Sequence, residues 1–204
     1  IARLKDIPDD YVQMVCTSPP YWALRDYGEE GQFGLEATPE LYVEKLVEIG
    51  KELKRVLRED GTFWLNIGDT YWGGGWRGYE LNDNSGDIQK SHKGTHDSED
   101  ISMGKGSHSV IKQKDMVGIP WRSAFGLQSD GWYLRQDIIW NKPNPMPESV
   151  TDRCTKAHEY IFLLSKSKNY YYDADAIKQP YRENTKPGSQ FGGKKGNSEL
   201  GMKT

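Results

Sequence analysis

Three successive patterns in the first third of the chain restrict its fold most. Residues 11–16 and 62–67 are short, mainly apolar runs with the length of buried strands. Between them, apolar residues recur at steps of three and four, as at Tyr42, Leu46 and Leu53, with charged residues on the opposite face. A strand, an amphipathic helix and a strand predict a βαβ unit, and therefore a parallel pair of strands with a helix on one face of the sheet.

The remaining patterns extend this α/β prediction. Thr38 and Pro39 suit the N-cap and the first position of the helix, and Asp60-Gly61 is expected to end it. Residues 1–8 read as the end of a helix, 115–128 as a second helix, 132–140 and 158–164 as two late strands, and the proline-rich 141–147 as an extended loop.

Bulk composition narrows the class of protein. The 204 residues, 35% of them hydrophobic, are enough for one sizeable domain. Cys16 and Cys154 lie far apart without a CxxC pattern, which suits a reducing cytoplasm and predicts no metal site. There is no signal peptide and no apolar run near the ~18 residues of a membrane span, so we expect a soluble cytoplasmic protein of a bacterial or phage-infected cell.

Charge is unevenly distributed along the chain. The net charge is −3, but residues 142–204 hold 11 Lys and Arg against 7 Asp and Glu. A face that binds phosphates is therefore expected in the second half. On charge alone, an ordinary solvated surface remains an equal alternative.

Two segments have the composition of loops. Residues 73–114 are rich in Gly, Ser, Asp, His and Lys and predict a long mobile loop, which could order over a bound ligand. His92, His96 and His108 lie in it, but no regular element fixes their spacing, so we do not expect a metal cluster. Residues 181–204 are polar and lack an apolar pattern.

The segment at 17–22, Thr-Ser-Pro-Pro-Tyr-Trp, carries the chemistry. It follows the first predicted strand, and ligands of open α/β sheets bind at the carboxyl ends of strands. Two consecutive prolines stiffen the turn and remove two backbone donors. The Ser18 hydroxyl and the Pro19 carbonyl, beside the ring of Tyr21, then suit a planar group with an NH2, such as a nucleobase. A proline-stiffened structural loop is the alternative.

Several blocks in the same order resemble the amino-methylating DNA methyltransferases, in the catalytic-motif-first order of phage and bacterial members. The resemblance implies a Rossmann-like, S-adenosylmethionine-dependent methyltransferase sheet, mostly parallel with one antiparallel late strand. The blocks are the segment at 17–22 with its extension to 28, Gly68-Asp69-Thr70-Tyr71, residues 138–144, Arg153, His158-Glu159 and Lys166-Ser167.

The resemblance also implies roles for residues. The target base is flipped out of the duplex, its amine is held by the proline loop, and it attacks the methyl of S-adenosylmethionine without a covalent enzyme intermediate. The implied catalytic residues are Ser18, Pro19, Pro20 and Tyr21, the base-pocket or supporting residues Thr17, Trp22, Asp69, Trp140 and Lys142, and the DNA-binding residues Arg153 and Lys156. For two of the supporting residues another role is open: Asp69 could be a turn carboxylate, and Trp140 a packing residue.

The family's motif order places a cofactor loop, Asp-Pro-Phe-x-Gly-Ser-Gly, near the carboxyl end. Phe191-Gly192-Gly193 resembles it only superficially, because neither a strand nor a helix flanks it. We therefore expect a partial methyltransferase domain at 1–180, followed by a polar segment that could begin the target-recognition region, and we assign no cofactor-binding residues.

Ser18 favours cytosine N4 as the target over adenine N6, whose enzymes more often carry Asp or Asn at this position. Double-stranded DNA is the implied partner, with a cognate restriction nuclease in a restriction-modification system; the oligomeric state is left open. A cytosine-C5 enzyme is disfavoured because Cys16 precedes the motif. A catalytically inactive DNA-binding module with this fold and amino-methylation of RNA or protein remain alternatives.

Overall fold

The computed structural model describes residues 2–28, 31–73 and 108–179. Contacts divide the chain into two units, 1–171 and 172–204, and the fold below is that of the first. In the second unit, the described residues 172–179 include a turn in which Asp173 Oδ1 accepts hydrogen bonds from two backbone N–H groups. Most of the predicted loop at 73–114, with His92 and His96, and the predicted polar segment at 181–204 lie outside the described residues.

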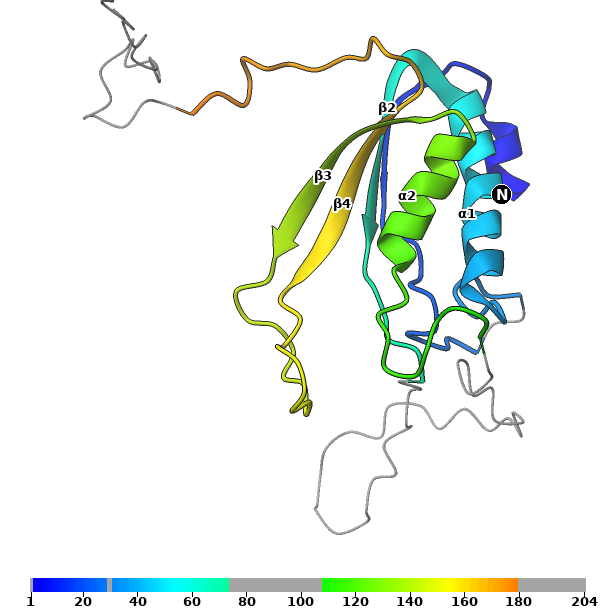
Figure 1. Cartoon of the computed structure of the whole chain (residues 1–204). Coiled ribbons are helices and arrows are strands. Elements are labelled where there is room, and N and C mark those ends of the chain that lie inside the picture. The colour runs from blue at the N-terminus through cyan, green and yellow to red at the C-terminus, as the bar shows by residue number, and fades with distance from the viewer. Residues whose placement is uncertain (1, 29–30, 74–107, 180–204) are drawn as a thin grey trace, which may run out of the picture. The chain divides into compact units, whose positions relative to one another are not determined.

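The regular elements follow the order predicted from the sequence (Figure 1). The expected strands at 11–16, 132–140 and 158–164 are each found within one residue of those limits. None of the helices described here has the length and apolar character needed to cross a membrane. The elements are η1 (Ala2–Asp6, a 3-10 helix), β1 (Val12–Thr17), α1 (Pro39–Val56), β2 (Leu57–Ile67), α2 (Ile119–Ser129), β3 (Tyr133–Asn141) and β4 (His158–Ser165).

The strands form one sheet in the order β1-β2-β4-β3. Strand β1 pairs with β2 in parallel, whereas β4 is antiparallel to both β2 and β3. Three strands therefore run in one direction and β4 runs against them, which confirms the predicted sheet with one antiparallel late strand. As a result, the carboxyl ends of β1, β2 and β3 and the amino end of β4 meet at one end of the sheet, here called the carboxyl edge.

Helix α1 forms as its sequence predicts. Thr38 is the N-cap, with Oγ1 accepting from the backbone N–H of Leu41 at 3.2 Å. The apolar stripe, including Tyr42 and Leu46, is buried. The predicted stop at Asp60-Gly61 is wrong, because the fully buried Leu57 already has extended dihedrals and the chain passes directly from α1 into β2.

Helix α2 begins at Ile119, four residues later than its pattern predicts. Gly118 has φ +79, in the left-handed region that interrupts a helix and favours glycine. Just before it, Met116 makes an isolated antiparallel bridge with Tyr71. The segment ahead of α2 is therefore pinned as extended chain beside the end of β2.

Both helices lie side by side on one face of the sheet (Figure 1). Two glycines allow this approach: a Cβ at Gly50 would lie 2.5 Å from Leu127 Cδ2, and one at Gly126 would lie 2.8 Å from Val43 Cγ1. The core beneath the helices is formed by side chains of β2 and β4 that alternate along each strand. They include Phe63, Leu65, Phe162 and Leu164, each at most 1% exposed.

Alternation places the intervening side chains of β2 and β4 on the face away from the helices. Asn66 pairs in register with Ile161, and Glu159 pairs with Trp140 of β3. This second face therefore carries polar side chains close to the carboxyl edge.

Candidate active site

The proline loop, residues 18–22, begins where β1 ends, at the carboxyl edge. Gly68 and Asp69 follow β2 at the same edge, Lys142 follows β3, and Glu159 lies at the start of β4. Segments separated by more than 130 residues thus converge on one end of the sheet. For this reason the blocks at 17–22, 68–71 and 158–159 are neighbours, whereas Lys166-Ser167 follows β4 at the opposite end of the sheet.

A buried tyrosine of α1 fixes the proline loop. The Tyr42 hydroxyl donates a hydrogen bond to the Pro20 carbonyl oxygen at 3.1 Å. Burial, reinforced by nearby Glu36, raises the pKa of Tyr42 well above its usual range, so the hydroxyl keeps its hydrogen and acts as a donor. Gly34 lies close against the loop: a Cβ there would come within 3.1 Å of the Tyr21 carbonyl oxygen, and its φ of +100 favours glycine.

Trp22, a predicted pocket residue, is part of the core. It is 2% exposed, its indole N–H donates to the Glu36 carbonyl oxygen at 2.8 Å, and its ring stacks on Trp72 with 6.1 Å between centroids. Its buried ring therefore anchors the end of the loop in the core, whereas Thr17, at the end of β1, is exposed.

Two oxygens of the loop remain available as acceptors. Ser18 is exposed, and its Oγ lies 3.3 Å from the Tyr21 hydroxyl. Among the described residues, no hydrogen bond to the Pro19 carbonyl oxygen is found, whereas the Pro20 carbonyl is taken by Tyr42. The loop therefore presents a Ser18 and a Pro19 oxygen on a backbone that is held in place.

Tyr21 is held by both its ring and its hydroxyl. The ring lies over Gly68, where a Cβ would approach Tyr21 Cε2 to 2.7 Å. The hydroxyl lies 3.0 Å from Asn66 Oδ1 and 2.9 Å from Glu159 Oε2. Burial raises the pKa of Tyr21 to about 12, and the Glu159 carboxylate adds to the shift. The phenol is therefore protonated at neutral pH.

Glu159 is the charged centre of this network. Its Oε1 is paired with Lys142 Nζ, while Oε2 accepts from Tyr21 and, at 3.4 Å, from Asn66 Nδ2. Burial opposes ionisation of the carboxyl, but the hydrogen bonds from Lys142 and Tyr21 outweigh it and hold the pKa of Glu159 below its usual value. The predicted supporting residue Lys142 thus reaches Tyr21 through Glu159.

The Asp69 carboxylate holds the start of α2. It accepts hydrogen bonds from the backbone N–H groups of Thr70 at 2.9 Å, Gly118 at 2.9 Å and Ile119 at 3.0 Å. Burial raises the pKa of Asp69, and the backbone hydrogen bonds offset only part of this effect. This geometry fits the turn-carboxylate alternative, extended to a helix 49 residues away in sequence.

Trp140, another predicted pocket residue, lies near the carboxyl end of β3. It is 55% exposed and pairs in register with Glu159. Because paired residues of neighbouring strands point to the same face, its ring and the Glu159 carboxylate lie on the face away from the helices. An exposed aromatic surface therefore lies beside the polar network.

The two predicted DNA-binding residues have partners within the chain. The Arg153 guanidinium lies over the Tyr71 ring, 4.0 Å from its centroid, and is ion-paired with Glu148. Lys156 Nζ donates to the Asp69 carbonyl oxygen at 3.0 Å, and burial lowers the pKa of this lysine. Both side chains therefore help to fix the segment between β3 and β4.

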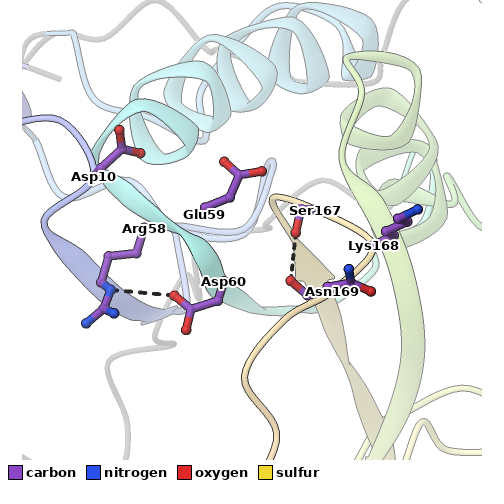
Figure 2. Close-up of a pocket in the computed structure, with 7 residues that line it drawn as sticks. All are labelled: Asp10, Arg58, Glu59, Asp60, Ser167, Lys168 and Asn169. Carbon is purple, nitrogen blue, oxygen red and sulfur yellow. Dashed lines mark hydrogen bonds and ion pairs between the residues drawn. The ribbon is translucent and has the colours of Figure 1, made fainter.

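A surface pocket lies at the opposite end of the sheet (Figure 2). Its residues precede β1, begin β2 and follow β4, so it lies away from the proline loop. Its charged residues include an Arg58–Asp60 ion pair, and it has no aromatic side chain. It therefore does not have the character of a base-binding site. The lining residues are Asp10, Arg58, Glu59, Asp60, Ser167, Lys168 and Asn169.

Comparison with known proteins identifies the family. A family model described as DNA methylase matches residues 12–197. The chain belongs to the N6/N4 DNA methylase family. Among curated methylases, it is 50% identical over 179 residues to the type II methyltransferase M.SmaI of Serratia marcescens, covering 87% of this chain and 57% of that protein. It is 48% identical to M.Cfr9I of Citrobacter freundii, covering 88% and 56%.

This methylase-family chain thus spans about half the length of the curated relatives it matches. Solved methylase structures share the fold at lower identity. PvuII DNA methyltransferase, named as cytosine-N4-specific, is 18% identical with a TM-score of 0.56, covering 86% of this chain and 51% of that one. A putative DNA modification methylase of Thermus thermophilus, solved with S-adenosyl-L-methionine, gives 0.51 at 18% identity, covering 86% and 56%.

Three residues of this site were given no role from the sequence. In the sequence, Tyr42 belongs to the apolar stripe of a helix, Asn66 to a buried strand and Glu159 to a block that resembles the family. None of these patterns predicts a role in the site for the residue. Only the pairing of β2 with β4 brings Asn66 and Glu159 together. A polar residue inside each apolar strand pattern was the one available signal.

Proposed function

We propose that this chain contains the base-binding part of an enzyme that methylates the exocyclic amine of a flipped base in double-stranded DNA, with S-adenosylmethionine as methyl donor. The observation that carries the proposal is the pair of available acceptors, Ser18 Oγ and the Pro19 carbonyl oxygen, on a loop anchored by Tyr42 and placed beside the Tyr21 ring. Membership of the DNA methylase family supports it.

The residues of the loop act on the amine. Its N–H groups donate to Ser18 Oγ and to the Pro19 carbonyl oxygen, which withdraws the nitrogen lone pair from conjugation with the ring and makes it available for attack. The ring of Tyr21 holds the planar base. Because Tyr42 fixes the loop before substrate binds, the acceptors need little reorganisation during the reaction.

The cofactor supplies the electrophilic methyl group when it is bound. No Phe-x-Gly-x-Gly pattern occurs in the 204 residues. We assign the described residues of the proline loop to the amine-accepting side of the reaction and none of them to the cofactor.

Cytosine N4 is the proposed target atom. Ser18 at the first motif position supports it, and so does the name of the PvuII methyltransferase, cytosine-N4-specific, whose fold this chain shares. Adenine N6 is the alternative, because its amine presents the same hydrogen atoms to the same acceptors.

The relatives M.SmaI and M.Cfr9I are named type II methyltransferases, which supports a restriction-modification setting for this chain. We propose that a nuclease with the same target sequence accompanies the enzyme. The basic surplus of residues 142–204 supports contact with DNA phosphates by this half of the chain.

Transfer of a labelled methyl group from S-adenosylmethionine tests the proposal. The protein expressed from its complete reading frame is incubated separately with unmethylated duplex DNA, with RNA and with a protein extract. We expect label in DNA, and about 100-fold less with Ser18→Ala, which removes one acceptor from the anchored loop. Label only in RNA or protein would favour those substrates, and DNA binding without any transfer would favour an inactive binding module.

A further inference from the structure

Three polar groups surround the Tyr21 hydroxyl, and counting hydrogens fixes their roles. Asn66 Oδ1 lies at 3.0 Å, Glu159 Oε2 at 2.9 Å and Ser18 Oγ at 3.3 Å. An amide oxygen and a carboxylate oxygen can only accept, and a phenol has one hydrogen to donate. Of the three neighbours only Ser18 can donate to the Tyr21 oxygen, so the Tyr21 hydrogen goes to Glu159 or Asn66 and not to Ser18.

The hydrogen between Ser18 and Tyr21 must then come from Ser18. A serine hydroxyl has one hydrogen and two lone pairs. Once its hydrogen is directed to the Tyr21 oxygen, at the long distance of 3.3 Å, both lone pairs of Ser18 Oγ remain free. Donation along such a chain also makes the serine oxygen a better acceptor.

The acceptors around Tyr21 are themselves oriented. Asn66 Nδ2 donates to the Tyr160 carbonyl oxygen at 3.1 Å, which turns Oδ1 toward Tyr21. Lys142 Nζ, which can only donate, is paired with the other oxygen of Glu159. The Tyr160 carbonyl and Lys142 thus hold Asn66 Oδ1 and Glu159 Oε2 as the two acceptors that face the Tyr21 hydroxyl.

We propose that Glu159 is a positioning residue which, through the Tyr21 hydroxyl, turns the Ser18 hydrogen away from the substrate, so that Ser18 Oγ meets the base amine as a hydrogen-bond acceptor only. This inference rests on the proposed function and deepens it. It separates the two parts of Tyr21: the ring faces the base, and the hydroxyl orients Ser18.

Glu159→Gln tests the direction of the network with little change in volume. Lys142 takes the amide oxygen, so the amide NH2 faces the Tyr21 oxygen and competes there with the Ser18 hydrogen. Ser18 then presents a donor to the amine for part of the time. We expect kcat to fall about tenfold, the value of one well-placed hydrogen bond, with KM for DNA within about twofold of wild type.

A double-mutant cycle distinguishes positioning from a structural role. Tyr21→Phe keeps the ring over Gly68 and removes the hydroxyl, and is also expected to lower kcat about tenfold. If Glu159 acts through that hydroxyl, Glu159→Gln has no further effect on kcat in the Tyr21→Phe background. Equal, multiplying losses in the two backgrounds would overturn the inference.

Matched controls are Glu44→Gln, on the exposed face of α1, and Tyr11→Phe, 71% exposed, both expected to leave kcat unchanged. Should Glu159→Gln not fold, Tyr21→Phe alone decides, because an undiminished kcat in this variant overturns the inference. The wild-type protein from its complete reading frame, run in the same assay, distinguishes a failure of the proposed function from a failure of the role of Glu159. Failure of the wild type to methylate DNA refutes the proposed function, whereas an active wild type with a multiplicative cycle refutes only the role of Glu159.

Discussion

The Tyr42 hydroxyl is the direct link between helix α1 and the proline loop, and Tyr42→Phe removes that link alone. The ring is fully buried and packs against Phe33 with 4.6 Å between centroids, so phenylalanine keeps these contacts. What disappears is the 3.1 Å hydrogen bond to the Pro20 carbonyl oxygen.

The structure sets the size of the effect. A partly buried carbonyl that loses its donor costs about 1 to 2 kcal/mol in the free energy of unfolding. Phenylalanine also lacks the hydroxyl whose burial costs free energy in the wild type, which offsets part of this loss. We therefore expect Tyr42→Phe to lower the free energy of unfolding by about 1 kcal/mol. Because the loop also loses its fixed geometry, we expect kcat for methyl transfer to fall about tenfold.

Urea unfolding followed by tryptophan fluorescence measures the stability, since Trp22, the last residue of the loop, is buried. The control is Tyr11→Phe, whose exposed hydroxyl should change the free energy by less than about 0.5 kcal/mol. Equal stabilities of Tyr42→Phe and Tyr11→Phe, or a full kcat in Tyr42→Phe, would refute the view that α1 holds the loop in place.

Three further substitutions test other contacts of the site. Gly68→Ala places a Cβ 2.7 Å from the Tyr21 ring, so it should lower kcat at least tenfold in steady-state assays while the far-ultraviolet circular dichroism stays unchanged. Asp69→Ala leaves three backbone N–H groups without their acceptor, two of them at the start of α2, and should lower the free energy of unfolding by about 1 to 2 kcal/mol in urea titrations; an unchanged value would exclude a capping role. The folded-state pKa of Glu159 is depressed, so its contribution is complete above the unfolded pKa of about 4.3 and is lost as the pH falls through the lower folded value. The stability gap between wild type and Glu159→Gln should therefore narrow below about pH 4 in unfolding curves, and a gap that widened there would contradict the ion pair with Lys142.

Local patterns predicted most of the elements because they are decided by nearby residues. Thr38, Pro39 and the stripe through Tyr42 specify α1 within a single stretch of chain, and the structure confirms them. The proline loop could likewise be placed at the end of β1, since a stiff dipeptide after an apolar run leaves few other conformations.

Contacts between distant segments decided what the sequence did not predict. The start of α2 depends on the left-handed Gly118 and on a carboxylate, Asp69, that follows another strand. Strand β4 lies between β2 and β3, and neither this order nor the register of the pairs can be derived from local patterns. The two together bring Glu159 to Asn66 and Tyr21. An apolar strand pattern carries no information about which neighbour a polar side chain will meet.

The most direct test of the central claim is mass spectrometry of nucleosides from unmethylated duplex DNA after incubation with S-adenosylmethionine and the protein from its complete reading frame. We expect N4-methylcytosine from the wild type and none when Ser18→Ala and Tyr21→Ala are combined. N6-methyladenine would keep the amine mechanism and correct the base. C5-methylcytosine, or no methylated nucleoside from DNA of varied sequence, would contradict the claim that the proline loop activates an exocyclic amine of DNA.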